Sequence, residues 1–532
     1  MDHETTSSPA RNGYAGHVWI TLCLLVVMAD ACLYRAEGYT GPAVFFPAAC
    51  LLLVWTLLRW RTDRAGSDGF VKVSFSVILL ISLLGIISLS MAWLGSWPQV
   101  LMAFWLLNAT VMMLQGHAPF LLESFTFAAG LVPGGYEFFH GIQLTWRRRI
   151  LGPVDYPRPS VTLNVMLPMF SVLVFGTLFL LANPDLIHAV SGRLGDFLTW
   201  IGRWFRKFSP GEIIFWCASL WLSGGLLRPL GRRLVDAGMS LLPELPKDFR
   251  HPLLSPFRNT LSTLILLFSA YLIFEFQTLW FRTFPPGFYY SGYAHQGAAW
   301  LTIALALATL LLSIIFRGTM LGDVRLPQLR RLAWIWSGLN LLLAASVYNR
   351  LLIYVDFNGM TRMRVVGFLG ISAVVGGFLL VLRKISRQYN FMWLVRRQLW
   401  VLGLAIYLFI TLPVDRLVHR YNVSRILSGS PAPSVQISEH PISDDALPVL
   451  IPLLKSDNVV IREGVRSLLW NRLLELSRTI PATSRHWTAR QFGPEQSRNQ
   501  LSAIRSELQQ IGDSDSAASA RNRFHEYSMQ WW

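Results

Sequence analysis

Charged residues are scarce in this chain. Asp, Glu, Lys and Arg occupy only 14% of its 532 positions, whereas hydrophobic residues occupy 53%. Soluble domains carry charge at about a quarter of their positions, so this composition excludes an ordinary soluble protein. Two-residue alternation, the pattern of barrel strands, is also missing from the apolar runs. The sequence therefore predicts an all-α fold, a polytopic bundle of transmembrane helices.

Cysteine is equally rare. The chain has four, all within apolar runs and without the paired spacing of a disulfide framework, zinc site or haem attachment: Cys23, Cys32, Cys50 and Cys217. We interpret them as small buried hydrophobic residues. No cofactor is predicted.

Motifs of catalysis are missing as well. The sequence contains no Walker loop, no HExxH, no GxSxG and no dinucleotide-binding glycine pattern. Four histidines stand isolated, at His117, His140, His188 and His295, so spacing indicates no metal site. These absences favour a protein that is not an enzyme.

Acidic residues are outnumbered by basic ones, and the formal net charge is +17. A basic balance can indicate nucleic-acid binding. Here, however, Lys and Arg form short clusters between apolar runs, as in the cytoplasmic loops of membrane proteins. We therefore expect the lipid bilayer, and no nucleic acid, as a partner.

Continuous apolar runs predict about eleven transmembrane helices, because most suit a hydrocarbon core about 30 Å thick. They follow a polar N-terminal tail, residues 1–17, and make up a transmembrane domain of residues 18–412. The runs are Val18–Tyr34, Ala43–Leu58, Val73–Leu94, Trp97–Leu114, Val161–Ala182, Glu212–Leu227, Leu261–Phe281, Ala298–Phe316, Leu332–Tyr354, Val365–Leu382 and Leu399–Leu412.

The loop charges predict an orientation in the inner membrane. If the N-terminus is cytoplasmic, most basic residues fall in cytoplasmic loops, as the positive-inside rule requires. An odd number of helices then places the C-terminus outside the cytoplasm. This count treats Phe120–Val132, which ends at Pro133-Gly134-Gly135, as a re-entrant or interfacial segment. If that segment crossed the membrane, most later basic clusters would lie outside.

Two further loops keep alternative interpretations. Leu186–Phe208 has the pattern of a helix lying in the membrane interface, or of a simple connector. Arg282–Gln296 is rich in aromatic residues, which indicates an interfacial belt or a binding surface.

Ionisable residues are concentrated between two long apolar runs, in Tyr348–Arg364. Asn358-Gly359 is a turn signal and Thr361 can cap the helix that follows, so Leu332–Tyr354 and Val365–Leu382 are predicted to form a helical hairpin. The charged residues of this segment either form salt bridges at the end of the hairpin or belong to a functional site.

A candidate polar cluster follows from the predicted orientation. Its residues fall near the outer ends of their helices: Asp30, Glu275, His295, Arg350, Tyr354 and Asp356. Asp30 and Glu275 lie inside apolar runs and would be costly to bury without a partner. We predict that one of these carboxylates pairs with Arg350 or lines an outward-facing polar pocket. No catalytic residue is assigned.

Beyond Leu412 the composition becomes polar. Residues 413–440 are predicted as a linker and residues 441–532 as a C-terminal helical region. Asp444–Leu454 and Val459–Leu476 suit an antiparallel pair resembling one HEAT repeat, which cannot bury a stable core alone. Pro494–Ile511 is a further helix candidate, whereas Gly512–Asn522 has the composition of a low-complexity segment.

Three segments carry a resemblance to a known family: GYAHQGAAWLTIALALATLLL from Gly292, RLLIYVDFNGMTRMR from Arg350, and VDRLVHRYNVSRIL from Val414 with DDALPVL from Asp444. Together they resemble a bacterial family of polytopic membrane proteins, domain of unknown function forty-one seventy-three. The resemblance spans about Phe257 to Leu450. It implies an integral membrane protein without an assigned activity.

Two functions remain open from the sequence. The first is a non-enzymatic regulatory or scaffold protein whose C-terminal helices bind a protein partner. The alternative is a transporter or lipid-handling protein with an outward-facing polar pocket. A continuous polar route through the helices would favour transport, and an exposed apolar groove on the C-terminal region would favour partner binding.

Overall fold

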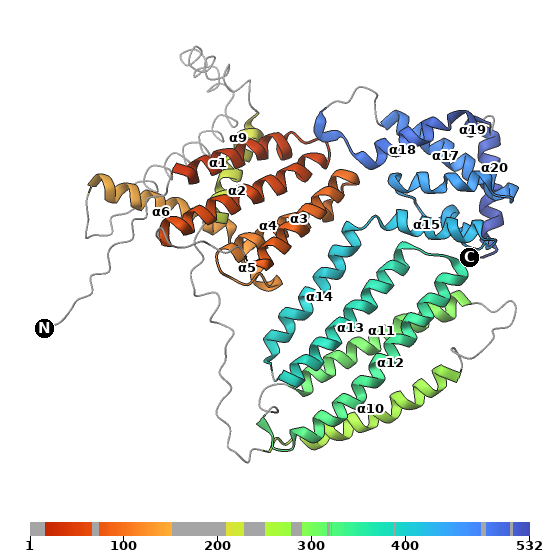
Figure 1. Cartoon of the computed structure of the whole chain (residues 1–532), viewed down its shortest axis with the longest axis horizontal. Helices are drawn as coiled ribbons and strands as arrows, with labels where there is room; N and C mark the ends of the chain where they lie inside the picture. Colours follow the sequence, from red (N-terminus) through yellow and green to blue (C-terminus); the bar gives the residue numbers. More distant parts are fainter. Residues whose placement is uncertain are drawn as a thin grey trace, which may run out of the picture. The chain divides into compact units, whose positions relative to one another are not determined.

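The computed structural model describes residues 16–65, 74–151, 209–227, 250–277, 290–316, 320, 322–387, 389–479, 486–510 and 514–531. Within these ranges all regular structure is helical and no residue lies in a strand (Figure 1). The predicted all-α class is confirmed. The chain is a polytopic helical bundle.

Among the described residues, 8 helices are long and apolar enough to cross a membrane. Each predicted run overlaps one of them or one of two shorter apolar helices, except Val161–Ala182, which lies outside the described residues, as does Leu186–Phe208. The helices up to residue 411 are α1 (Gly16–Ala29), η1 (Asp30–Tyr34), α2 (Thr40–Ala65), α3 (Phe75–Trp93), α4 (Trp97–Leu114), α5 (Leu121–Ala129), α6 (Leu131–Leu151), α9 (Pro210–Leu227), α10 (Leu254–Glu275), α11 (Tyr290–Ile315), α12 (Leu326–Asn358), α13 (Arg362–Arg387) and α14 (Phe391–Thr411).

Several helices extend beyond the apolar runs into residues that the sequence assigned to loops. α14 begins at Phe391, two turns before the predicted Leu399, and the Asn390 side chain caps it by accepting a hydrogen bond from the Trp393 amide at 2.7 Å. Arg396 and Arg397 are therefore helical. A helix can continue past the apolar core because long basic side chains carry their charge to the interface.

Residues 120–135 depart from the prediction. The expected single segment Phe120–Val132 is divided between α5 and α6. Pro133 was expected to end that segment, but it lies inside the first turn of α6. A proline is tolerated there because the first helical turn has no intrahelical acceptor for its N–H groups. With 9 residues, α5 is too short to cross a bilayer.

Contacts divide the chain into two compact units. Unit 1 comprises residues 1–35, 51–71 and 129–229, and unit 2 comprises residues 36–50, 72–128 and 230–532. In unit 1, α9 packs on α1 and α6, and Glu212 accepts a hydrogen bond from Arg35 at 2.6 Å. In unit 2, the C-terminal region belongs to the same compact body as α10–α14.

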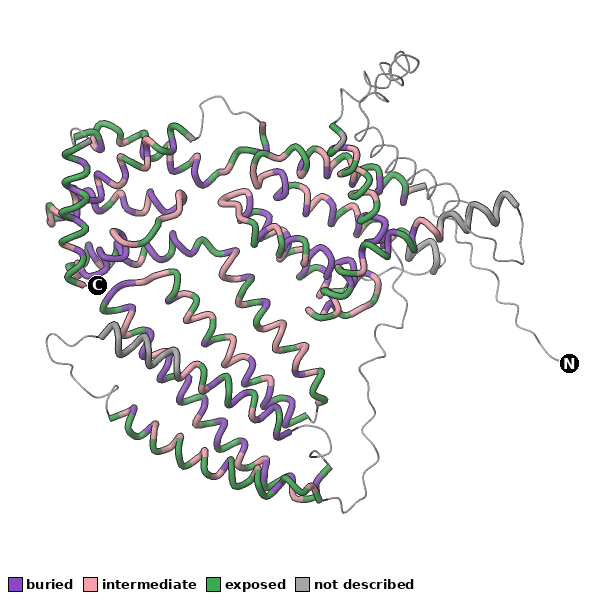
Figure 2. The backbone as a smooth tube through the Cα atoms, turned by 180° about the vertical axis from the view of Figure 1, so that it is seen from behind, coloured by how far each residue is buried: buried purple, intermediate pink, exposed green. Residues whose placement is uncertain are grey.

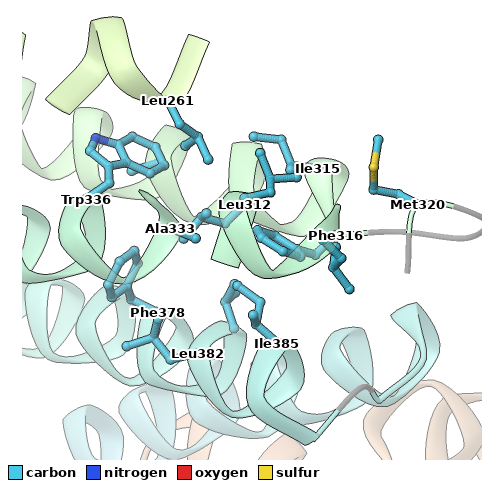
Figure 3. Packing of buried hydrophobic residues seen from close by; sticks show 14 of the residues in the cluster. Leu261, Leu312, Ile315, Phe316, Met320, Ala333, Trp336, Phe378, Leu382 and Ile385 are labelled. Carbon is cyan, nitrogen blue, oxygen red and sulfur yellow. The ribbon is translucent and has the colours of Figure 1, made fainter. Parts of the chain in front are cut away.

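The bundle of unit 2 has an apolar core between α10, α11, α12, α13 and α14. Trp336, Phe316 and Phe378 lie within it (Figure 3). Other large apolar residues remain exposed: Leu266, for example, is 72% exposed. Exposed positions, green in Figure 2, occur along the helices of the bundle. Exposed apolar surface of this kind suits contact with lipid.

Local chemistry explains the hairpin between α12 and α13. Gly359 ends α12 with φ of 85°, a conformation that glycine adopts without steric cost. Thr361 then accepts a hydrogen bond from the Arg364 amide at 3.2 Å. The predicted hairpin, with its glycine turn and threonine cap, is confirmed.

The residues after 412 fold around a second apolar core. Leu447, Leu469 and Phe524 are buried in it. The helices are α15 (Val414–Leu427), α16 (Ser434–Glu439), η6 (Asp444–Lys455), α17 (Val459–Thr479), η7 (Trp487–Ala489), α18 (Phe492–Ala503), α19 (Arg505–Gln509) and α20 (Ser514–Met529). We call this part the C-terminal domain.

Three features of the C-terminal domain differ from the sequence-based expectation. Residues 413–440, predicted as a linker, hold α15 and α16, whose inner faces are buried. The segment predicted as Asp444–Leu454 is a 3-10 helix, because Pro448 and Pro452 remove backbone donors. The low-complexity Gly512–Asn522 contributes most of its residues to α20. The likeness of η6 and α17 to a HEAT repeat stays a prediction.

Candidate functional site

A buried ion pair joins α10 to α12. Arg350 donates from Nε to Glu275 Oε1 at 2.6 Å and from a terminal guanidinium nitrogen to Oε2 at 2.5 Å. Ser346 and Tyr271 also donate to this carboxylate, at 2.5 and 3.0 Å. Glu275 is 0% and Arg350 4% exposed. A buried charge pair is tolerated when the pairing is bidentate and additional donors hydrogen-bond the carboxylate.

The other residues of the predicted polar cluster have different surroundings. Asp30, in unit 1, lies 3.1 Å from Arg35 Nε and accepts from Trp216 Nε1 at 2.8 Å. Tyr354 stacks under the Arg364 guanidinium, whose carbon lies 3.7 Å from the ring centroid.

Asp356 is paired at 2.9 Å with Arg425 of α15. His295 lies in α11, and its side chain is outside the described residues, as are residues 282–289 of the aromatic loop. The structure thus brings Glu275 and Arg350 together and gives Asp30, Tyr354 and Asp356 other partners.

The turn between α12 and α13 is held by the C-terminal domain. Asn422 of α15 binds one residue of the turn twice: its Oδ1 accepts from the Met360 amide at 2.6 Å, and its Nδ2 donates to the Met360 carbonyl at 2.9 Å. A Cβ atom at Gly359 would lie 2.6 Å from Asn422 Oδ1 and 2.8 Å from Pro433. This close approach requires glycine, independently of the backbone conformation.

Two further hydrogen bonds reach the last residue of α12. Gln436 Nε2 donates to the Asn358 carbonyl at 2.9 Å, and Asn358 Nδ2 donates to the Trp531 carbonyl at 3.0 Å. The end of the chain therefore returns to the hairpin. The contact with Gln436 uses a main-chain group of the turn, whereas the contact with Trp531 uses the Asn358 side chain.

An ion pair borders the turn. Arg362, the first residue of α13, pairs through two nitrogens with both carboxylate oxygens of Asp415, and the Ser443 amide donates to Asp415 at 2.9 Å. Burial alone would raise the pKa of Asp415, but the hydrogen bonds from Arg362 and Ser443 outweigh it and lower the pKa. Asp415 is therefore ionised at neutral pH.

His419 lies one turn further along α15 and is 3% exposed. Burial lowers the pKa of His419 to about 4, so its ring is neutral at pH 7. Sequence reasoning named no residue of α15 as a site. The available signal was polar residues at positions 415, 419 and 422, a spacing that places them on one helix face.

The C-terminal domain also contacts the starts and ends of earlier helices in unit 2. The Glu37 amide donates to Thr488 Oγ1 at 3.1 Å, and Thr40 Oγ1 donates to the Arg490 carbonyl. A Cβ atom at Gly493 would lie 2.8 Å from the Trp93 carbonyl. The domain is thus attached at the start of α2 and the end of α3 as well as at the hairpin.

A cavity of about 620 Å³ opens at this junction, here called the junction cavity. It is bounded by four stretches of the chain: the end of α3 through the start of α4, the end of α14 with the start of α15, Arg362 of α13, and Ser443 with Asp445 at the start of η6. Its walls are mainly apolar, with a few polar side chains, which is the usual make-up of a ligand site. No group of three or more metal-ligating residues occurs in the described part of the chain.

Comparison with known families gives one result. A family model described as "Domain of unknown function (DUF4153)" matches residues 48–453. This differs in number from the family suggested by the sequence motifs, and it includes the first half of the chain, which that resemblance left out. No curated protein and no solved structure matches the chain.

Proposed function

We propose that this chain is a non-enzymatic regulatory scaffold. The chain belongs to the family described as domain of unknown function 4153 and is a multi-pass membrane protein, so its role is argued from its own geometry. In this role the membrane helices hold the C-terminal domain in a fixed position, and the C-terminal domain binds a protein partner.

The double hydrogen bond from Asn422 to Met360 is the observation that carries the proposal. A domain that was only tethered to the membrane would not need a buried polar side chain that hydrogen-bonds one particular backbone turn. Such a side chain is costly to bury unless its hydrogen-bond partners stay in place. The fixed attachment supports a function in which the position of the domain matters.

We further propose that the C-terminal domain lies outside the cytoplasm. It contacts the ends of α3 and α12 and follows directly on α14, which supports one side of the membrane for these three ends. Basic residues gather at the opposite ends, for example Arg330, Arg331, Arg387, Arg396 and Arg397. Cytoplasmic segments carry such an excess, which supports an inner-membrane protein with an extracytoplasmic C-terminus. A reporter fused after Trp532 should be active only outside the cytoplasm; a strong cytoplasmic signal would reverse the orientation.

The alternative, a transporter, would use the buried charges of the bundle. Glu275 already accepts hydrogen bonds from Arg350, Ser346 and Tyr271, so binding a substrate would require breaking them. The pair therefore supports a structural link between α10 and α12. It gives transport no specific support.

The scaffold proposal is tested by loosening the attachment. Full-length protein and its Asn422→Ala variant are cross-linked in native membranes, purified and analysed by mass spectrometry. We expect a cross-linked partner that is recovered with the unaltered chain and lost with Asn422→Ala. The control is Asn499→Ala, at an exposed position of α18. Equal recovery of the partner with Asn422→Ala would show that attachment does not matter and would overturn the proposal.

A further inference from the structure

Three side chains that line the junction cavity have a buried polar atom without a hydrogen-bond partner among the described residues. One of these atoms belongs to the Thr411 hydroxyl, which can donate or accept, and the other two can only accept. Gln99 donates from Nε2 to Ser90 and to the Ile410 carbonyl, both at 2.9 Å, but its Oε1 accepts no hydrogen bond from the described residues. Asp445 accepts from Ser443 at Oδ1, at 2.6 Å, and its Oδ2 is likewise without a donor there. Both side chains line the cavity.

These two acceptors are deeply buried. Gln99 and Asp445 are each 4% exposed. An unsatisfied buried polar atom costs about 1–3 kcal/mol, and more when it is charged. Two such atoms on side chains that line one cavity therefore favour a ligand that supplies N–H or O–H donors.

The charges around the junction cavity narrow the class of ligand. Arg362 and Asp415 neutralise each other, which leaves the Asp445 carboxylate and the Arg416 guanidinium, near the Trp93 ring, as the remaining charges. One negative and one positive group suit a zwitterion. The negative group, Asp445, is itself one of the two buried acceptors, so the cationic end of the ligand would lie beside Asp445 and Gln99.

The position and walls of the cavity narrow the class further. The cavity lies where the candidate membrane spans Phe75–Trp93, Trp97–Leu114 and Phe391–Thr411 end. Leu89, Phe409 and Leu412 supply apolar walls. A volume of about 620 Å³ is within the range of small-ligand sites. A molecule that is polar at one end and apolar at the other fits this boundary.

We propose that the junction cavity binds the headgroup of an aminophospholipid such as phosphatidylethanolamine. The primary ammonium donates to Asp445 Oδ2 and Gln99 Oε1, the phosphate lies toward Arg416, and the acyl chains leave along the apolar walls. This binding goes beyond the scaffold role and does not depend on it.

The test measures lipid retained by the full-length protein. Protein is purified in detergent with phosphatidylethanolamine, phosphatidylcholine or phosphatidylglycerol, and bound lipid is counted by native mass spectrometry. We expect retention of phosphatidylethanolamine. Phosphatidylcholine has the same net charge but no N–H donors, and phosphatidylglycerol has no ammonium, so both should be lost. Equal retention of all three lipids would overturn the proposal.

Variants assign the binding to the cavity. Asp445→Asn removes the charge with little change of shape and should weaken phosphatidylethanolamine retention about tenfold, the effect of losing one charge-assisted hydrogen bond. The matched control is Asp457→Asn, the same change at an exposed position of the C-terminal domain. Equal weakening by both variants would contradict the assignment.

Two measurements on the unaltered chain complete the test. A photoreactive phosphatidylethanolamine should label peptides around Trp93–Gln99 and Phe409–Arg416, and labelling elsewhere only would overturn the site. Soluble phosphoethanolamine separates a lipid ligand from a free headgroup. It should displace the lipid only at far higher concentration, and displacement at equal concentration would exclude the lipid as the ligand.

Discussion

The bundle α10–α14 and the C-terminal domain use their buried polar groups differently. In the bundle, Glu275 is satisfied by side chains of two membrane helices, and Lys384 donates to the carbonyls of Ser313 and Phe316 near the end of α11. In the C-terminal domain, Asn422 and Gln436 instead hydrogen-bond main-chain groups of the α12–α13 turn.

This difference reflects what surrounds each region. A helix in lipid satisfies its own backbone, so its buried polar side chains pair with one another, with helix ends or with the carbonyl four residues earlier, as Asn340 does with Trp336. The hairpin turn leaves backbone groups unpaired, and the C-terminal domain supplies the missing partners. The hydrogen bonds of Glu275 and Lys384 thus stay within the bundle, whereas the turn and the domain depend on each other.

The largest expected effect is in the bundle. Arg350→Leu leaves the Glu275 carboxylate buried without its main partner, which should cost about 3–5 kcal/mol. We expect a sharp loss of monodisperse protein by size-exclusion chromatography. The exposed Arg258→Leu on α10 should have little effect. The double variant Arg350→Leu with Glu275→Leu should recover most of the yield; failure to recover would mean that the pair does more than satisfy its own charges.

The next effect is a pH dependence in the C-terminal domain. His419 has a folded pKa of about 4 and an unfolded pKa near 6.5, so the unfolded chain binds the extra proton between these values. Stability should be unaffected above pH 6.5 and should fall as pH drops toward 4, by at most about 3 kcal/mol.

Hydrogen exchange of α15 at pH 7 and pH 5 measures this loss. His419→Gln removes the titrating group and should flatten the profile, whereas His486→Gln, at a partly exposed position, should not. A profile unchanged by His419→Gln would assign the pH dependence to other groups.

A smaller effect tests the contact between the two regions. Gly359→Ala places alanine at φ of 85° and ψ of −173°, a region occupied almost only by glycine, at about 1–3 kcal/mol, and also drives its Cβ against Asn422 and Pro433. Gly429→Ala also requires alanine at a positive φ, of 98°, but nothing lies within 4 Å of its Cβ. Limited proteolysis should therefore release the C-terminal domain faster from Gly359→Ala. Equal rates would mean that the contact with Asn422 adds nothing.

The smallest effect is expected at the surface of the C-terminal domain. Glu475 pairs with Arg472 at 2.6 Å, but its side chain is 58% exposed. Exposed pairs contribute little, so Glu475→Gln should change the free energy of unfolding by less than about 0.5 kcal/mol in thermal denaturation. A loss comparable to that of Arg350→Leu would remove the contrast between buried and exposed pairs.

Local sequence patterns predicted the features that neighbouring residues encode. Apolar runs located the membrane helices, and Asn358-Gly359 with Thr361 predicted the hairpin, because turn and cap chemistry acts within a few residues. Helix ends were less well predicted, as at Phe391, since helical hydrogen bonding continues after hydropathy falls.

Only the tertiary structure decided which distant groups meet. Arg350 was predicted to pair with a carboxylate, but the choice of Glu275, 75 residues away, depends on the depth and rotation of α10 against α12. The same holds for the polar face of α15, whose composition looked like that of a linker until it met the hairpin turn. The junction cavity is made of four separate segments, and no segment alone specifies how the others are placed.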